Sequence, residues 1–103
     1  MKIIAIEREG RQASPEAFQP YLAFEALRLW DLYQAGKVRE LYFRADKPEA
    51  VLILECDDIE SAGNLLRTLP LVNAGLITFD LIPLKPYPGF ARLFDSNFGR
   101  AGD

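Results

Sequence analysis

The feature that most constrains this chain is a nearly unbroken apolar run, AVLILEC, at residues 50–56. A strand with one face in water alternates apolar and polar residues, so an unbroken run predicts a strand that is covered on both faces. A second strand-like run, residues 38–44, lies just before it. The five residues between them, 45–49, contain the Asp, Pro and charged groups that are typical of a turn. Residues 36–57 are therefore predicted to form a β-hairpin around which the rest of the chain is arranged.

Two helices flank this hairpin in the sequence. Ser-Pro-Glu at residues 14–16 combines a hydroxyl cap, a proline in the first turn and an acid, which together indicate a helix start. Apolar residues at helical spacing continue to Gly36, and Pro20 either kinks this helix or marks the start of its main part. Asp57 is the expected cap of the second helix, which Pro70 ends.

Residues 2–7 and 76–84 supply a first and a last strand, so the order of elements is β-α-β-β-α-β. With right-handed crossovers this order predicts a ferredoxin-like α+β domain over residues 1–84. We expect a four-stranded antiparallel sheet with the first and third strands in the centre and both helices on one face. The strands are apolar on both faces, and an uncovered apolar sheet exceeds what monomers normally expose. We therefore expect a homodimer or a higher homo-oligomer.

Residues 85–103 form a separate C-terminal extension in this interpretation. Its first part, KPYPGF, is spaced by prolines and is expected to be extended. The extension contains four large apolar residues: Phe90, Leu93, Phe94 and Phe98. We expect them to dock on the partner subunit or on the chain's own domain, with a lid over a ligand as the alternative. The last five residues are expected to fray.

Composition excludes several classes of function. The net charge of −3 does not favour binding to a phosphate backbone, so no nucleic-acid partner is expected. The apolar runs are too short to cross a bilayer, so no membrane partner is expected. A single cysteine, Cys56, allows no internal disulfide and fits a cytoplasmic location. The chain has no histidine and no phosphate-binding glycine loop, so neither a metal site nor any other cofactor is predicted.

Two stretches of sequence resemble a known family. Residues 35–42 read AGKVRELY, and a Leu-Pro-Leu run at residues 69–71 precedes the final LITFDLIPLKPYP. Over residues 34–84 this pattern resembles muconolactone isomerase and its relatives, in which the first stretch reads glutamate, glycine, a small residue, Trp, Arg, His, Leu, Trp. Arg39 matches that pattern, whereas Glu40 stands where the family has its histidine. The resemblance implies a dimeric α+β barrel of ferredoxin-like subunits and a cofactor-free isomerase.

The family reaction shifts a double bond by removing a proton next to a carbonyl group and returning it elsewhere. It requires a base, a hydrogen-bond donor for the enolate and a cation for the substrate carboxylate. Glu40 is the candidate catalytic base and Tyr42 the candidate catalytic donor, and Arg39 or Arg44 is the candidate cation. Alternate residues of a strand lie about 7 Å apart on one face, so Glu40, Tyr42 and Arg44 can contact one ligand. Arg39 points to the other face unless the strand has a bulge.

Three further residues are candidate substrate contacts. Trp30 and Tyr33, late in the first helix, are expected to pack on the sheet, with the lining of a pocket between helix and sheet as the alternative. Asp80 lies in an apolar strand, where a carboxylate needs a partner, and either a dimer interface or a ligand would supply one. Glu7, at the end of the first strand, is a weaker case of the same kind.

The candidate catalytic residues also have simpler interpretations. A symmetric turn places Arg39 opposite Glu55, where the two would form a cross-strand ion pair. Glu40 on an edge strand can be a solvated charge that prevents aggregation. Tyr42 can be a core residue with its hydroxyl group at the rim.

Two hypotheses for function follow. The first is a cofactor-free isomerase, or a related enzyme, that acts on a small hydrophobic carbonyl compound. The alternative is a non-catalytic dimeric module that binds a small molecule or serves assembly. A cavity that contains Tyr42 or Trp30 beside an acid with a raised pKa favours catalysis. A packed interior, with Arg39 bonded to Glu55 and Glu40 in water, favours the alternative.

Overall fold

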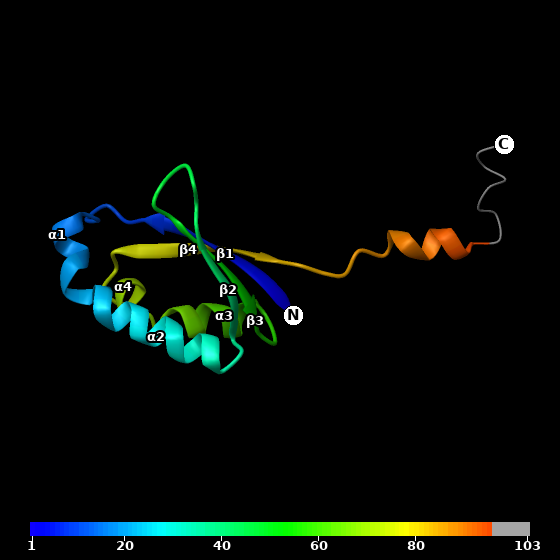
Figure 1. The fold of residues 1–103 in the computed structure, drawn as a ribbon, viewed down its shortest axis with the longest axis horizontal. Coiled ribbons are helices and arrows are strands. Elements are labelled where there is room, and N and C mark those ends of the chain that lie inside the picture. Colours follow the sequence, from blue (N-terminus) through cyan, green and yellow to red (C-terminus); the bar gives the residue numbers. More distant parts are fainter. Residues whose placement is uncertain (96–103) are drawn as a thin grey trace.

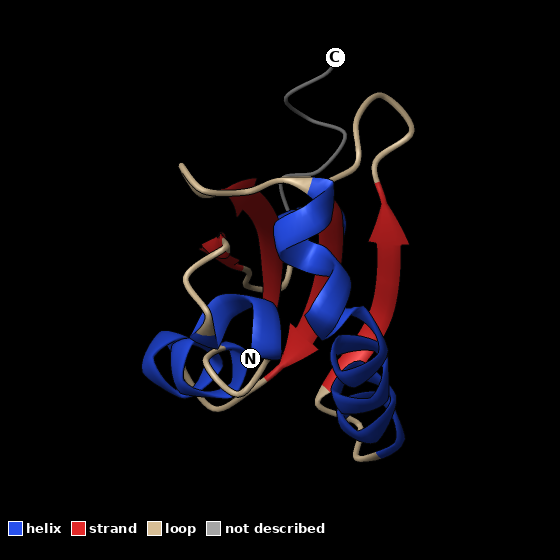
Figure 2. Cartoon of the chain, turned by 90° about the vertical axis from the view of Figure 1, so that its left-hand side faces the viewer, coloured by secondary structure: helices blue, strands red, loops and turns tan. Residues whose placement is uncertain are grey.

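The structure, a computed structural model, describes residues 1–95. Four strands form one antiparallel sheet in the order β2-β3-β1-β4 (Figure 1). Their bounds are Lys2–Glu9 for β1, Val38–Phe43 for β2, Ala50–Glu55 for β3 and Ile77–Pro83 for β4. The first and third strands are central and the helices cover one face of the sheet (Figure 2), which confirms the predicted ferredoxin-like α+β fold.

The first helical segment is divided into three parts. Helix α1 (Pro15–Phe18) begins after Ser14, whose Oγ accepts a hydrogen bond from a backbone amide at 3.0 Å. A 3₁₀ helix, η1 (Gln19–Tyr21), contains Pro20, and α2 (Leu22–Gln34) follows it. The main helix therefore begins two residues after Pro20, because proline has no N–H group to donate to a helical hydrogen bond and the tighter turn of η1 accommodates it.

The second helical segment contains α3 (Ile59–Leu66) and α4 (Pro70–Asn73). Asp58, and not Asp57, caps α3: its Oδ1 accepts a backbone amide three residues on at 2.7 Å. Asp58 has the extended backbone that directly precedes the helix, so the predicted cap is wrong by one residue. Residues 71–75 are not the expected simple connector, because α4 begins at Pro70. No helix within residues 1–95 is long and apolar enough to cross a bilayer.

The core lies between the helices and the sheet. Its largest fully buried side chains come from all four strands and from the turn before α4: Ile3, Val38, Leu52, Leu54, Ile77 and Leu69. None of the helices within residues 1–95 lies on the opposite face of the sheet (Figure 2). Apolar side chains of β1 and β3 on that face are half-buried: Ile4, Ile6, Val51 and Ile53.

The chain continues from β4 into an arm, residues 84–95, that projects away from the domain (Figure 1). The arm contains a second 3₁₀ helix, η2 (Gly89–Phe94). The Tyr87 ring lies over Gly89, leaving no room for a Cβ there, and it meets Phe90 edge to face with ring centroids 5.2 Å apart. Phe98 and the five residues expected to fray lie outside the described residues.

Replacement of Leu54 tests the position of the core. Leu54 is fully buried on the helix-covered face of β3, so Leu54→Ala should lower the free energy of unfolding by about 2–5 kcal/mol through lost contacts and a new cavity. Leu27→Ala, at an exposed position of α2, should change it by less than about 0.5 kcal/mol. Urea denaturation followed by circular dichroism measures both values. Equal effects of the two changes would contradict this description of the core.

Candidate functional site

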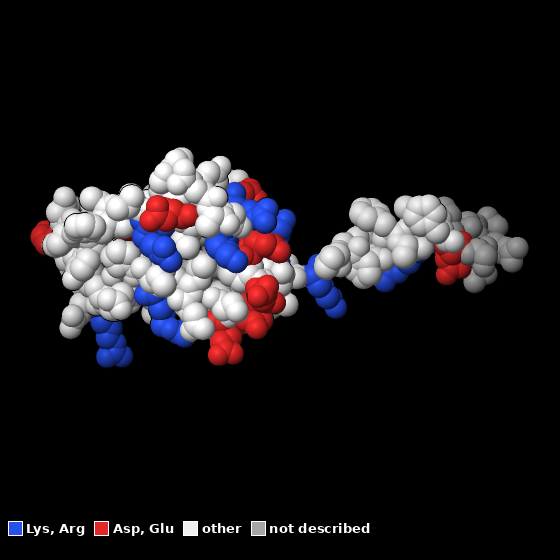
Figure 3. Space-filling model, turned by 90° about the horizontal axis from the view of Figure 1, so that it is seen from below, with Lys and Arg blue, Asp and Glu red and all other residues white. Residues whose placement is uncertain are grey.

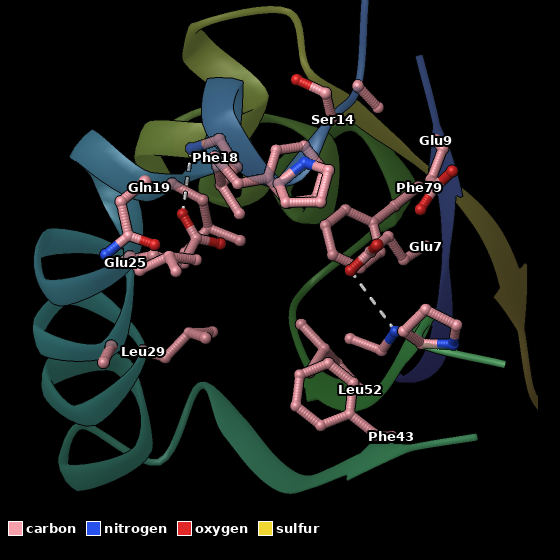
Figure 4. A pocket seen from close by; sticks show the side chains of 18 residues that line it. Glu7, Glu9, Ser14, Phe18, Gln19, Glu25, Leu29, Phe43, Leu52 and Phe79 are labelled. Carbon is pink, nitrogen blue, oxygen red and sulfur yellow. Dashed lines mark hydrogen bonds between the residues drawn. The ribbon is translucent and has the colours of Figure 1, made fainter. Parts of the chain in front are cut away.

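A pocket of about 620 Å³ lies between α2 and the helix-covered face of the sheet (Figure 4). Its walls are mostly apolar, with large side chains from two helices and three strands: Phe18, Leu29, Phe43, Leu52 and Phe79. The small side chains of Ala26 and Ala50 also line it and leave space between helix and sheet. Small-molecule sites occupy roughly 300–1,000 Å³, so this pocket is the candidate functional site.

Glu25 of α2 supplies the first of two buried carboxyl groups in the pocket. The residue is 8% exposed, and its Oε1 accepts a hydrogen bond from the backbone N–H of Leu71 at 2.9 Å. Leu71 lies in the first turn of α4, where N–H groups have no partner within the helix. Burial raises the pKa of Glu25, and the Leu71 hydrogen bond offsets part of that effect. The same contact joins α2 to α4.

Glu7 of β1 supplies the second buried carboxyl group and is 6% exposed. Its Oε1 accepts a rather long hydrogen bond, 3.3 Å, from the backbone N–H of Ala50 on the neighbouring strand. Burial is the largest cause that raises the pKa of Glu7, and the Ala50 hydrogen bond opposes it. The nearby carboxyl groups of Glu49, Glu9 and Glu25 raise the pKa further.

Each of these carboxyl groups keeps one oxygen available to a ligand. The two hydrogen bonds involve Oε1 in each case, and no buried side-chain oxygen or nitrogen in the described part of the chain lacks a partner. The Oε2 atoms of Glu7 and Glu25 therefore reach the open space, which the two side chains enter from opposite walls (Figure 4). A protonated oxygen there can donate to a ligand, and an ionised one can accept a proton.

Among residues 1–95, the ionisable side chains that line the pocket are all carboxyl groups. Besides Glu7 and Glu25, the exposed carboxyl group of Glu9 lines it, and none of its lining residues among positions 1–95 is Lys or Arg. The chain also has no histidine. Repulsion in a partly desolvated site therefore disfavours ligands that carry a carboxylate or phosphate group.

Glu40 and Tyr42 lie together on the other face of the sheet, outside this pocket. The Tyr42 hydroxyl group donates a hydrogen bond to Glu40 Oε1 at 2.6 Å, which raises the pKa of Tyr42. Both side chains are exposed on edge strand β2, and their partners across the hairpin are Val51 and Ile53 of the uncovered face. The strand thus brings the predicted base and donor together. Tyr42 is not a core residue, and the catalytic roles of the pair stay predictions.

Arg39 does not pair with Glu55. A bulge in β2 between Val38 and Glu40 shifts the register, so Arg39 has no residue directly opposite on β3. Its Nε donates to the carbonyl oxygen of Gly36 at 2.6 Å, while Glu55 binds the N-terminal ammonium group at 3.1 Å. The expected cross-strand ion pair is therefore wrong, and the symmetric register from which it followed is wrong as well.

Arg44 and Asp80 belong to one network of ion pairs. Asp80 pairs with Arg8 of the adjacent strand at 2.8 Å, and Arg8 also contacts Glu49 at 3.2 Å. Arg44 contacts Glu49 at 3.0 Å and Asp46 at 2.6 Å. The partner that Asp80 needs is thus supplied within the same chain. Neither Arg44 nor Asp80 lines the large pocket.

Trp30 and Tyr33 line a second, shallower pocket of about 340 Å³ between α2 and edge strand β2. Their rings stack with centroids 5.9 Å apart, and Leu41 of β2 forms the facing wall. The alternative of a pocket beside these aromatic residues therefore holds, but no carboxyl group of residues 1–95 lines it. Ala26 and Leu29 line both pockets, so the two hollows adjoin.

Glu25 carries a sequence signal that comparison with family motifs overlooks. It lies within the apolar stripe of the first helix, beside Leu22 and Leu29, at a position where the helix faces the protein interior. A charged residue inside such a stripe is unusual and indicates a buried carboxyl group with a partner. Glu7 shows a similar signal, because it ends an otherwise apolar strand.

The raised pKa values of Glu7 and Glu25 determine how stability depends on pH. An acid whose pKa is higher in the folded chain than its ordinary 4.5 binds protons more readily when folded. Its contribution to stability therefore increases as the pH falls through the folded-state pKa toward 4.5. At about pH 8, Glu7→Gln removes a buried charge and should raise the free energy of unfolding, by about 1.4 kcal/mol for each unit of pKa elevation. The difference should shrink near about pH 4.5.

Urea denaturation at several pH values measures this effect, with the exposed Glu16 changed to Gln as the control. The control should follow the wild-type pH dependence. If Glu7→Gln is less stable than wild type at every pH, the ionised carboxylate stabilises the fold. That result would contradict a raised pKa of Glu7.

Comparison with known proteins gives a likeness of fold. No protein-family model and no curated protein matches the chain. The crystal structure of muconolactone isomerase is similar to it over 85% of this chain and 92% of its own, with a TM-score of 0.70 and 18% identity. A 5-chloro-2-hydroxyhydroquinone dehydrochlorinase from Burkholderia phenoliruptrix, in complex with 2,5-dihydroxybenzoquinone, covers 86% of this chain and 98% of its own, with a TM-score of 0.64 and 18% identity. The chain therefore has a muconolactone isomerase-like fold, as the resemblance in sequence predicts.

Proposed function

We propose that this protein is a cofactor-free isomerase, or a related enzyme, that moves a proton on a small, uncharged, hydrophobic carbonyl compound. The observation that supports this proposal is the pair of buried carboxyl groups, Glu7 and Glu25, on opposite walls of an apolar pocket. Burial brings the pKa of such groups closer to neutral pH, where a carboxyl group exchanges protons with a substrate most effectively.

The surroundings of the two carboxyl groups favour different roles. Glu25 accepts the shorter hydrogen bond, and other carboxyl groups lie around Glu7, so these contacts favour Glu25 as the ionised group and Glu7 as the protonated one. We assign Glu25 as the base that takes a proton from the carbon next to the carbonyl group. Glu7, protonated, donates to the carbonyl oxygen as the enol forms. Return of the proton from Glu25 to a different carbon, and of the enol proton to Glu7, completes the double-bond shift and restores both groups.

The charge of the pocket narrows the class of substrate. The family reaction needs a cation for a substrate carboxylate, and the pocket's lining residues among positions 1–95 supply three carboxyl groups and no cation. A neutral lactone, ketone or quinone avoids the repulsion that an anion would meet. The dehydrochlorinase of similar fold is complexed with a dihydroxybenzoquinone, a small ring compound with carbonyl groups, which supports this choice of size and chemistry.

Glu40 and Tyr42, with Arg39 or Arg44 as the cation, remain the competing assignment of catalytic residues. Those four residues lie outside the pocket, so a ligand bound to them would be on the surface of β2 unless a second copy covers it. Variants of Glu40 and Glu25 therefore distinguish the two assignments directly.

The uncovered sheet face is proposed to pack against the same face of a second copy, giving a homodimeric α+β barrel in the cytoplasm. Its half-buried isoleucine and valine side chains support this arrangement, because a contiguous apolar patch of that kind is rarely left in water. Sedimentation equilibrium at micromolar protein should therefore report a dimer, and Ile53→Asp should convert it to a monomer. A wild-type monomer under these conditions would contradict the arrangement.

Proton exchange on a simple ketone tests the reaction. With 3-cyclohexen-1-one in D₂O, the protein should accelerate deuterium incorporation next to the carbonyl group and the formation of the conjugated ketone, measured by NMR and absorbance. Glu25→Gln should lower the rate by about 10²- to 10⁴-fold, and Glu7→Gln should also lower it. Glu9→Gln, in the same pocket but exposed, and Glu40→Gln should change the rate only a few-fold. A ring ketone that bears a carboxylate should react poorly.

One outcome would contradict the assignment of the catalytic residues, and another would contradict catalysis itself. A large loss in Glu40→Gln with none in Glu25→Gln would favour the assignment on β2. The second outcome starts from a small molecule that stays bound to the wild-type protein through native purification and is identified by mass spectrometry. If the protein does not accelerate deuterium exchange on that molecule above the buffer rate, the non-catalytic binding module is favoured.

A further inference from the structure

Glu49, at the end of the turn between β2 and β3, is a buried carboxyl group that the proposed reaction does not use. The residue is 8% exposed, and its Oε1 contacts Arg44 at 3.0 Å, Arg8 at 3.2 Å and Lys47 at 3.5 Å. Acidic and basic groups also lie side by side on the surface of the domain drawn in Figure 3. Exposed ion pairs contribute little to stability, whereas a buried carboxylate needs its partners and is held in place by them.

The peptide unit that joins Glu49 to Ala50 is hydrogen-bonded on both sides. The Glu49 carbonyl oxygen accepts a hydrogen bond from the backbone N–H of Arg44 at 2.9 Å. The Ala50 N–H of the same unit donates to Glu7 Oε1 at 3.3 Å (Figure 4). The paired register of β1 and β3 ends at Val51, the neighbour of Ala50, so the Ala50 N–H binds a side chain of β1 where the regular ladder has stopped. The turn outside the pocket is thus connected to an acid inside it.

The Ala50 hydrogen bond favours one position of the Glu7 proton. In a protonated carboxyl group the oxygen without the hydrogen is the better acceptor, so an N–H directed at Oε1 favours the hydrogen on Oε2. Oε2 is the oxygen that reaches the open space of the pocket. It is also the oxygen from which Glu7 donates to the substrate carbonyl group in the proposed reaction.

The charge of Glu49 acts on Glu7 as well. Nearby carboxyl groups raise the pKa of Glu7, and the contribution of Glu49 is larger than those of Glu9 and Glu25. The guanidinium group of Arg8 pairs with the Glu49 carboxylate, and it contacts Glu7 through the backbone carbonyl oxygen at 3.4 Å. Removal of the Glu49 charge would therefore also leave Arg8 less compensated beside Glu7, and both changes favour the ionised form of Glu7.

We propose that Glu49 is a positioning residue of the site, which fixes the Ala50 N–H against Glu7 and keeps Glu7 in the protonated form that donates to the substrate. Glu49 is not among the lining residues of the pocket within positions 1–95, so it acts through Glu7 and does not touch the substrate. This inference rests on the proposed function, in which Glu7 is the acid.

Titration of Glu7 tests the inference without any substrate. In protein labelled with ¹³C at the glutamate carboxyl carbons, the signal that is missing from Glu7→Gln identifies Glu7, and its change with pH gives the titration midpoint. Glu49→Gln should move this midpoint to lower pH, whereas Glu49→Asp, which keeps the charge, should move it less. Asp46→Asn is the matched control, because Asp46 is an exposed acid of the same turn that also pairs with Arg44. It should leave the midpoint as in wild type.

The pH profile of ketone isomerisation extends the test to the reaction. The wild-type rate should fall at high pH as Glu7 ionises, and in Glu49→Gln this fall should begin at lower pH. Above both midpoints, kcat should be about tenfold lower for each unit of displacement, with KM little changed, because only the protonated fraction of Glu7 differs. A merely structural role of Glu49 would lower the stability of Glu49→Gln and leave the midpoint of Glu7 in place.

A second variant keeps the inference testable if Glu49→Gln does not fold. Arg44→Gln removes a cation that compensates Glu49, so it should move the Glu7 midpoint in the opposite direction, to higher pH. An unchanged Glu7 midpoint in folded Glu49→Gln, or in Arg44→Gln, would overturn the role of Glu49 even if the wild-type protein isomerises the ketone. Absence of ketone exchange together with displaced midpoints would instead contradict the proposed function and establish the coupling of Glu49 to Glu7.

Discussion

The hydrogen bond between Glu25 and the Leu71 amide is the interaction on which the candidate site depends. The first turn of α4 has an N–H group without a helical partner, and the carboxyl group of Glu25 is buried among apolar side chains. Either group alone would be costly to bury, and each satisfies the other. The bond also connects α2 to α4 on one wall of the pocket, while Glu7 faces it from the sheet. This one contact thus helps to hold the wall of the pocket and offsets part of the effect of burial on the pKa of Glu25.

Much of the fold follows from local features of the sequence. The run at residues 50–56 can only be a central strand, because its two faces are equally apolar. Right-handed crossovers then leave few ways to arrange two helices and four strands. The wrong predictions concern the ends of helices, where two neighbouring residues can each take the same capping position. Asp57 and Asp58 are equally good caps, and backbone conformation alone selects Asp58. Pro20 is compatible with more than one start of the main helix, and in the structure it lies in the 3₁₀ helix η1, before α2 begins.

The site depends on contacts that a single sequence does not display. Glu25 and Leu71 are 46 positions apart, and only the packing of α2 on α4 brings them together. The family resemblance draws attention to β2, where its motif lies, yet a bulge at Arg39 and the register of the hairpin set the direction of each side chain there. Glu40 and Tyr42 meet as strand spacing requires, but on the uncovered face. A buried acid in an apolar stripe is the signal that the sequence does contain, and it identifies Glu25 without any motif.

The presence of two buried carboxyl groups, Glu7 and Glu25, around one cavity couples its occupancy to proton concentration. An uncharged ligand that fills the cavity displaces water from the Oε2 atoms and makes the ionised forms still less favourable. Ligand entry should therefore draw a proton from the buffer, and by thermodynamic reciprocity mild acidification should tighten binding. A calorimeter would register this as a binding heat that changes with the ionisation enthalpy of the buffer. A chain without histidine can in this way sense acidity through carboxyl groups alone.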